Sequence, residues 1–146
     1  RVARSHFLVL PLFGTRLILV APPVLLPPEL IPPGVSYSYH LEEVLPQGDV
    51  IYLLRVQKER QSEGLLPSLG EYAAVYGLNE KRLSLLKEEV FLMHPGPVNV
   101  GIEINYKALK RLKSFPTRKI LFQEQVQNGV YVRMAILDIF VAGRVV

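Results

Sequence analysis

The sequence predicts an α/β fold: a doubly wound, mostly parallel sheet with helices on both of its faces. Short apolar runs, such as residues 49–54 and 90–93, alternate with segments of helical spacing. Each of these two runs is followed directly by a polar loop, RVQKER after the first and HPGP after the second. This pattern is typical of the carboxyl ends of buried parallel strands, where open α/β sheets bind their ligands. We therefore expect both loops to converge on one crevice.

The elements follow in order along the chain. Residues 2–13 are predicted to form an amphipathic helix, which Gly14 ends. The predicted strands are residues 15–21, 35–39, 49–54 and 90–93, with a last short extended piece at 119–122. Further helices are predicted over residues 41–45, 67–76, 79–86 and about 125–142. Ser68 and Asn79 are the expected caps of two of these helices.

The order of the elements is unusual at the N-terminus. A helix comes first, with no strand before it to feed the sheet, and the chain does not begin with Met. We therefore expect the first strand of this domain to lie upstream, in a part of the protein that precedes Arg1.

Composition limits the possible functions. The chain of 146 residues has room for one domain, and it contains no cysteine, so a disulfide framework and a thiolate metal site are excluded. The three histidines show no metal-like spacing, and we predict no metal. The net charge of +4 comes from scattered basic residues, which favours a solvated basic face over a nucleic-acid site. The longest apolar run is too short and too rich in proline to cross a membrane, and we predict no membrane partner.

The loop after residues 49–54 offers a candidate anion site. Arg55 can aim a guanidinium fork at a ligand carboxylate, Glu59 can hold that guanidinium, and Gln57 can offer an amide oxygen to a ligand amine. The alternative is a surface loop with a local ion pair, which is the commoner role for an arginine. Arg1 precedes a predicted helix, where anions bind, but its position at the chain end makes it uninformative by itself.

The second loop, His94 to Pro97, gives a sharper signal. Two prolines around Gly96 fix the backbone and remove donors, so the loop offers the carbonyl oxygens of Gly96 and Pro97. Rigid carbonyls at a strand end suit a ligand that brings N–H groups, such as a carbamoyl group or an amide. The alternative is a tight turn that only ends the strand. We interpret His94 as a hydrogen-bonded supporting residue rather than a metal ligand or a base.

Five segments together resemble a known family. RVARS (1–5), the APP–LLPPE stretch (21–29), YLLRVQKERQ (52–61), MHPGPVN–G–EI (93–104) and FQEQVQNGVYVRMA (122–135) resemble the aspartate-binding domain of aspartate carbamoyltransferase, a Rossmann-like domain. The resemblance runs the length of the chain in order. It implies a cytoplasmic enzyme of pyrimidine biosynthesis that transfers the carbamoyl group of carbamoyl phosphate to the amine of L-aspartate, without a cofactor.

The resemblance also implies roles for individual residues. Arg1 and Arg55 would bind the two carboxylates of L-aspartate, while Gln57 would orient its amine and Glu59 would hold Arg55. The carbonyls of Gly96 and Pro97 would bind the carbamoyl NH2 group, and the bond between these two residues would be cis. Val100 departs from the family pattern, because many bacterial members carry an arginine there.

The resemblance implies partners too. Residues 1–146 would form one aspartate-binding domain, whose C-terminal helix at about 125–142 packs on a carbamoyl-phosphate domain that is absent from the sequence. The whole enzyme would be a homotrimer, with regulatory chains or a dihydroorotase as possible further partners, and residues 1–146 alone would be inactive. Two alternatives stay open: a non-catalytic domain with a structural or assembly role, and a transcarbamoylase for another amino acid.

Overall fold

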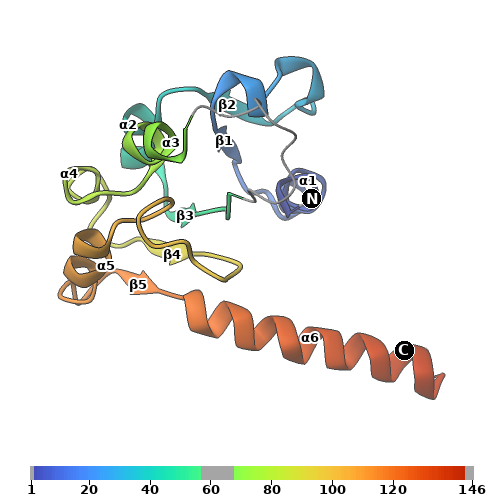
Figure 1. Cartoon of the computed structure of the whole chain (residues 1–146). Coiled ribbons are helices and arrows are strands. Elements are labelled where there is room, and N and C mark those ends of the chain that lie inside the picture. The colour runs from blue at the N-terminus through green and yellow to red at the C-terminus, as the bar shows by residue number, and fades with distance from the viewer. Residues whose placement is uncertain (1, 57–67, 144–146) are drawn as a thin grey trace.

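The computed structural model describes residues 2–56 and 68–143 (Figure 1). Its α-helices are α1 (Val2–Val9), α2 (Leu41–Val44), α3 (Leu69–Tyr76), α4 (Glu80–Leu83), α5 (Tyr106–Leu112) and α6 (Phe122–Ala142). Its strands are β1 (Ile18–Val20), β2 (Ser36–Ser38), β3 (Val50–Tyr52), β4 (Phe91–Met93) and β5 (Lys119–Ile120). Short 3-10 helices cover Leu10–Phe13, Pro23–Leu25, Pro28–Leu30 and Leu45–Gln47. The alternation of strands and helices confirms the predicted α/β class.

All strand pairs in the described ranges are parallel, as predicted, but the strands form two hydrogen-bonded sheets. One sheet has the order β1-β2 and the other has the order β3-β4-β5. In the larger sheet Ile51 pairs with Leu92, and Leu92 pairs with Ile120. The strands are shorter than predicted, because the apolar runs extend past the regular ladder into the loops. A backbone hydrogen bond of 2.9 Å from the Leu53 N–H to the Met93 carbonyl continues the pairing beyond β3 and β4.

The hydrophobic core lies around the larger sheet. Its buried residues are Leu45, Leu78, Leu83, Leu86, Val90, Leu92, Ile104, Ala108 and Leu112. Leu92 comes from the central strand β4, while Leu83 and Leu112 come from α4 and α5. Fully burying side chains of this size stabilises the fold by about 1.5–3 kcal/mol each. The core therefore fixes β4, the strand that leads directly into the His94–Pro97 loop.

The helix predicted for residues 2–13 is α-helical only to Val9. Its last turn is a 3-10 helix, because Pro11 has no N–H with which to continue the α-helical ladder. Gly14 ends this turn with φ +71°, and its N–H bonds to the carbonyls of Leu10 and Pro11. This confirms the predicted role of Gly14.

Three further helices differ from the prediction, and of these α4 ends at Leu83, before the predicted end at residue 86. Helix α5 was not predicted, although Asn105 caps it by accepting a hydrogen bond of 2.6 Å from the Ala108 N–H. Helix α6 begins at Phe122, three residues earlier than predicted, and extends away from the rest of the molecule (Figure 1). Its 21 residues include no buried one. No helix in the described ranges is long and apolar enough to span a membrane.

Candidate functional site

The two loops predicted to form a site leave adjacent parallel strands at the same end. Arg55 follows β3 by three residues and is half-buried, and His94 follows β4 directly. Arg1, Gln57 and Glu59 lie outside the described residues. Their predicted roles at the site therefore stay predictions.

The His94–Pro97 loop has a fixed backbone. Gly96 has φ +70°, where a side chain is strained, and the Gly96–Pro97 peptide bond is cis, as the family resemblance implied. The Gly96 N–H donates a hydrogen bond of 2.9 Å to Nδ1 of His94. Within the described part of the chain, no hydrogen bond is made to the carbonyl oxygen of Gly96 or Pro97. These carbonyls can accept hydrogen bonds from a ligand.

His94 is fully buried behind this loop, and its backbone and ring both make defined contacts. Its backbone N–H donates a 2.9 Å hydrogen bond to Oε1 of Gln125, in the first turn of α6. Because Nδ1 accepts from Gly96, the neutral imidazole carries its proton on Nε2, which lies 3.8 Å from Oε2 of Glu103. The ring also lies against Phe122, with centroids 5.8 Å apart. His94 is thus hydrogen-bonded within the fold, and its supporting role at the site stays a prediction.

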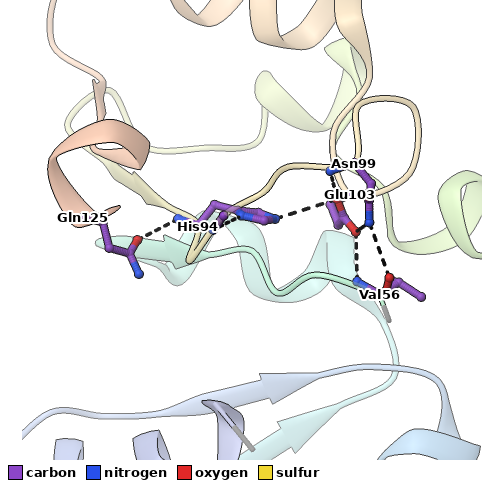
Figure 2. Close-up of polar contacts among 6 residues, drawn as sticks. Val56, His94, Asn99, Glu103 and Gln125 are labelled. Atoms are coloured by element: carbon purple, nitrogen blue, oxygen red, sulfur yellow. Dashed lines mark hydrogen bonds and ion pairs between the residues drawn. The ribbon is translucent and has the colours of Figure 1, made fainter. Parts of the chain in front are cut away.

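Glu103 connects the two loops (Figure 2). Its Oε1 accepts hydrogen bonds from the Val56 N–H at 2.9 Å and from the Asn99 side-chain amide at 2.9 Å. Its Oε2 accepts one from the Asn99 N–H at 2.7 Å and faces His94. The Asn99 amide also donates to the Val56 carbonyl at 3.4 Å. Val56 directly follows Arg55, so this carboxylate anchors the chain beside the predicted carboxylate-binding arginine.

The surroundings of Glu103 favour its ionised form. The residue is only 3% exposed, and burial by itself raises the pKa of a carboxyl group. Interactions with His94, Val56 and Asn99 outweigh this effect and hold the pKa of Glu103 below its ordinary value. The carboxylate is therefore a fixed negative charge at neutral pH.

A second set of contacts joins helix α1 to the same loops. The His6 ring packs edge-on against Tyr52 at the end of β3, with centroids 4.5 Å apart. The Gln125 side-chain amide donates a hydrogen bond to the Tyr52 hydroxyl, while its carbonyl oxygen holds the His94 N–H. Val126, the next residue of α6, lies where a Cβ on Gly96 would meet it at 3.1 Å. The first turn of α6 thus packs behind the loop, although the rest of the helix extends away.

Sequence reasoning did not find Glu103, Asn99, Gln125 or Tyr52 as parts of the site. Glu103 stands between two isoleucines, a pattern that also describes an ordinary half-exposed segment. Its hydrogen bond to Val56 spans 47 residues, so no local pattern reveals it. Val100, where the family pattern has an arginine, is 49% exposed. No group of three or more His, Cys, Asp or Glu side chains suited to a metal occurs among the described residues.

Comparison with known proteins identifies the family of this domain. The model of the aspartate/ornithine carbamoyltransferase family, Asp/Orn binding domain, matches residues 1–140. The chain belongs to this family. It is 46% identical over 143 residues to the aspartate carbamoyltransferase catalytic subunit of Desulfitobacterium hafniense (strain DSM 10664 / DCB-2), a match that covers 98% of the chain and 44% of the relative. It is 47% identical over 137 residues to the subunit of the same name from Syntrophobacter fumaroxidans, covering 94% of the chain and 43% of the relative. The chain thus spans less than half the length of these relatives.

Solved structures agree with this assignment. Aspartate transcarbamoylase from Trypanosoma cruzi in complex with carbamoyl phosphate and aspartate matches with a TM-score of 0.61 and 29% identity, over 82% of this chain and 39% of that one. Ornithine carbamoyltransferase from Burkholderia thailandensis matches with a TM-score of 0.61 and 17% identity, over 89% of this chain and 40% of that one. The second likeness supports the fold alone. Together they place the chain in the transcarbamoylase fold.

Proposed function

We propose that this chain is the aspartate-binding half of an aspartate carbamoyltransferase. In the reaction, the amine nitrogen of L-aspartate attacks the carbamoyl carbon of carbamoyl phosphate, forms a C–N bond and loses a proton. The bond from that carbon to the phosphate oxygen breaks, which gives N-carbamoyl-L-aspartate and phosphate. The observation that carries the proposal is the juxtaposition of Arg55 and the Gly96–Pro97 carbonyls at the ends of two paired strands, joined through Glu103.

The chemistry of the two loops suits this substrate pair. A guanidinium binds a carboxylate through paired charge-assisted hydrogen bonds, and we assign Arg55 to one carboxylate of aspartate and Arg1 to the other. Gln57 orients the amine and Glu59 holds Arg55. The Gly96 and Pro97 carbonyls accept hydrogen bonds from the carbamoyl NH2 group. Catalysis in this scheme is mainly positioning and electrostatic stabilisation, with no organic cofactor and no metal.

The proposal extends to the rest of the protein. The curated relatives are more than twice as long as the matched segment, which supports a further carbamoyl-phosphate domain in the whole enzyme. We propose that α6 packs on that domain through its exposed apolar side chains, and that residues 1–146 alone are inactive. We further propose a cytoplasmic homotrimer that serves pyrimidine biosynthesis. Regulatory chains or a dihydroorotase are the further partners that fit such an enzyme.

The test is a kinetic comparison in the full-length enzyme. Arg55→Ala is expected to lower kcat/KM for L-aspartate by roughly 100-fold or more, since one charge-assisted interaction contributes about 1.5–3 kcal/mol and Arg55 offers a paired one. Lys110→Ala removes an exposed positive charge from α5 and is the matched control, with wild-type kinetics expected. Wild-type aspartate kinetics in Arg55→Ala would contradict the assigned role.

Two further measurements separate the alternatives. Substrate competition between L-aspartate and a monocarboxylate amino acid such as ornithine tests the amino-acid preference, because only a dicarboxylate uses two arginines. A full-length protein that binds neither substrate would instead support a non-catalytic role in assembly.

A further inference from the structure

The buried carboxylate of Glu103 accepts hydrogen bonds from donors on both sides of the candidate site. The Val56 N–H belongs to the segment that contains Arg55, and the Asn99 groups belong to the segment that follows Pro97. His94, at the start of the second loop, lies 3.8 Å away through Nε2. One side chain thus contacts the backbone next to Arg55 and the residues on either side of the Gly96–Pro97 pair (Figure 2).

Among the described residues, each hydrogen-bond or ion-pair partner of the Glu103 carboxylate is a donor. The Val56 and Asn99 backbone N–H groups and the Asn99 side-chain amide all donate to it. His94 also presents a donor, because its Nδ1 already accepts from the Gly96 N–H and its proton is therefore on Nε2. Each carboxylate oxygen of Glu103 makes two of these contacts. The position therefore requires a side chain that only accepts hydrogen bonds. A glutamine of the same shape would turn an NH2 group toward two of these donors.

We propose that Glu103 is a positioning residue that holds the Arg55 segment in register with the Gly96–Pro97 loop. This inference rests on the proposed function, since it assigns aspartate to the first segment and the carbamoyl group to the second. Glu103 does not touch either substrate in this scheme, because its side chain is only 2% exposed beneath the loops. It acts through Val56 on the neighbouring Arg55, and through His94 on the N–H of Gly96.

The coupling has a specific kinetic consequence. The attacking amine and the carbamoyl carbon must meet in one geometry, and a small misplacement of one substrate relative to the other slows the chemical step strongly. Loss of the Glu103 contacts frees the two loops from each other while leaving Arg55, Gly96 and Pro97 in the sequence. The result is a weaker aspartate site and a slower reaction, not only a less stable protein.

The experiment compares Glu103→Gln with wild type in the full-length enzyme. We expect KM for L-aspartate to rise roughly 10-fold and kcat to fall roughly 10- to 100-fold. Glu89→Gln, which neutralises an exposed glutamate, is the matched charge control and is expected to keep wild-type values. Leu112→Ala, in a fully buried core position on α5, is the control for lost stability. At a temperature where Leu112→Ala and Glu103→Gln are both folded, only Glu103→Gln should show the raised KM.

Each outcome has a distinct meaning. An active wild type with unchanged kinetics in Glu103→Gln, or with the same change in Leu112→Ala, would overturn the role of Glu103 and leave the proposed function standing. A wild type that does not carbamoylate aspartate would overturn the proposed function, and this role with it. If Glu103→Gln does not fold, Asn99→Ala decides the question. It removes only the side-chain amide bonds to Glu103 and Val56, so a smaller rise in KM is expected and wild-type kinetics would overturn the proposal.

Discussion

The two parallel sheets of this domain use the same backbone pairing but differ sharply in burial. Strands β1 and β2 contain no buried residue, and neither do β3 and β5, but the central strand β4 buries Leu92 and the buried hydrophobic core lies within residues 45–112 around it. Both loops of the candidate site leave the buried sheet. Hydrogen-bond pairing therefore does not by itself hold a sheet firmly in place. The packing around β4 holds the larger sheet, and both loops of the site follow strands of that sheet.

The largest effect on stability is expected from the central strand of the buried sheet. Leu92 is fully buried, so Leu92→Ala should lower the free energy of unfolding by about 2–5 kcal/mol through lost burial and the cavity left behind. Leu19→Ala, in β1, is the matched change in the other sheet. Leu19 is half-buried there, and we expect a cost of about 1 kcal/mol. Urea unfolding of both variants measures the difference, and equal costs would contradict the contrast between the sheets.

The next effect comes from Glu103, whose lowered pKa makes stability depend on pH. Its contribution is fully present above the ordinary pKa of 4.5 and is lost as the pH falls through the lower value of the folded protein. Glu103→Gln should lower the free energy of unfolding by about 1–3 kcal/mol at pH 7, because buried donors lose their acceptor. It should also make the free energy of unfolding depend less on pH in the acid range.

Glu42 is the matched carboxylate for this test. The hydrogen bond from Arg82 lowers its pKa as well, but the Glu42 side chain is 50% exposed. Glu42→Gln should therefore change the pH dependence of stability in the acid range less than Glu103→Gln does. Thermal unfolding from pH 7 to pH 3 compares the two variants. A larger change in Glu42→Gln would show that burial at Glu103 does not strengthen its interactions.

The two halves of the domain also differ in what the sequence predicted. Local sequence signals were sufficient to predict that Gly14 ends the first helix. They were also sufficient to predict Ser68 and Asn79 as the caps of α3 and α4. They were sufficient for the existence and direction of the strands as well. The division into two sheets was missed, because it depends on which strands pair and not on any one strand.

The parts of the site that the sequence missed depend on long-range contacts. The loop of His94 to Pro97 was recognised from its prolines, but Glu103 looks like a surface glutamate until its contact with Val56 is known. Helix α5 was missed because its basic residues suggested only a solvated face. Ala108 and Leu112, four residues apart and both fully buried, carried the helical signal.

The cap of α5 provides a prediction of intermediate size. The Asn105 side chain accepts a hydrogen bond from the Ala108 N–H, and α5 contributes two residues to the buried core. Asn105→Ala should therefore cost about 1 kcal/mol in the free energy of unfolding. Asn105→Asp keeps the acceptor and should cost less. Chemical denaturation of the two variants checks this, and an equal loss in both would show that the cap does not contribute.

The smallest effect on stability is expected in α6, where the contrast with the buried sheet is greatest. Leu137 is 62% exposed and Phe140 is 81% exposed, on a helix that extends away from the domain. Leu137→Ser should change the free energy of unfolding by less than about 0.5 kcal/mol, because no packing is lost. If these side chains instead meet another domain in the whole enzyme, their exposure in residues 1–146 creates an apolar surface that binds a hydrophobic dye.

Dye fluorescence therefore separates a free helix from one that normally packs on another domain. Residues 1–146 should bind the dye, Leu137→Ser together with Phe140→Ser should bind less of it, and the full-length enzyme should bind little. Lys107→Ser, on the exposed side of α5, is the control and should leave dye binding unchanged. Equal dye binding by the full-length enzyme and by residues 1–146 would contradict the packing of α6. In that case its apolar side chains would be ordinary surface residues, and not half of an interface.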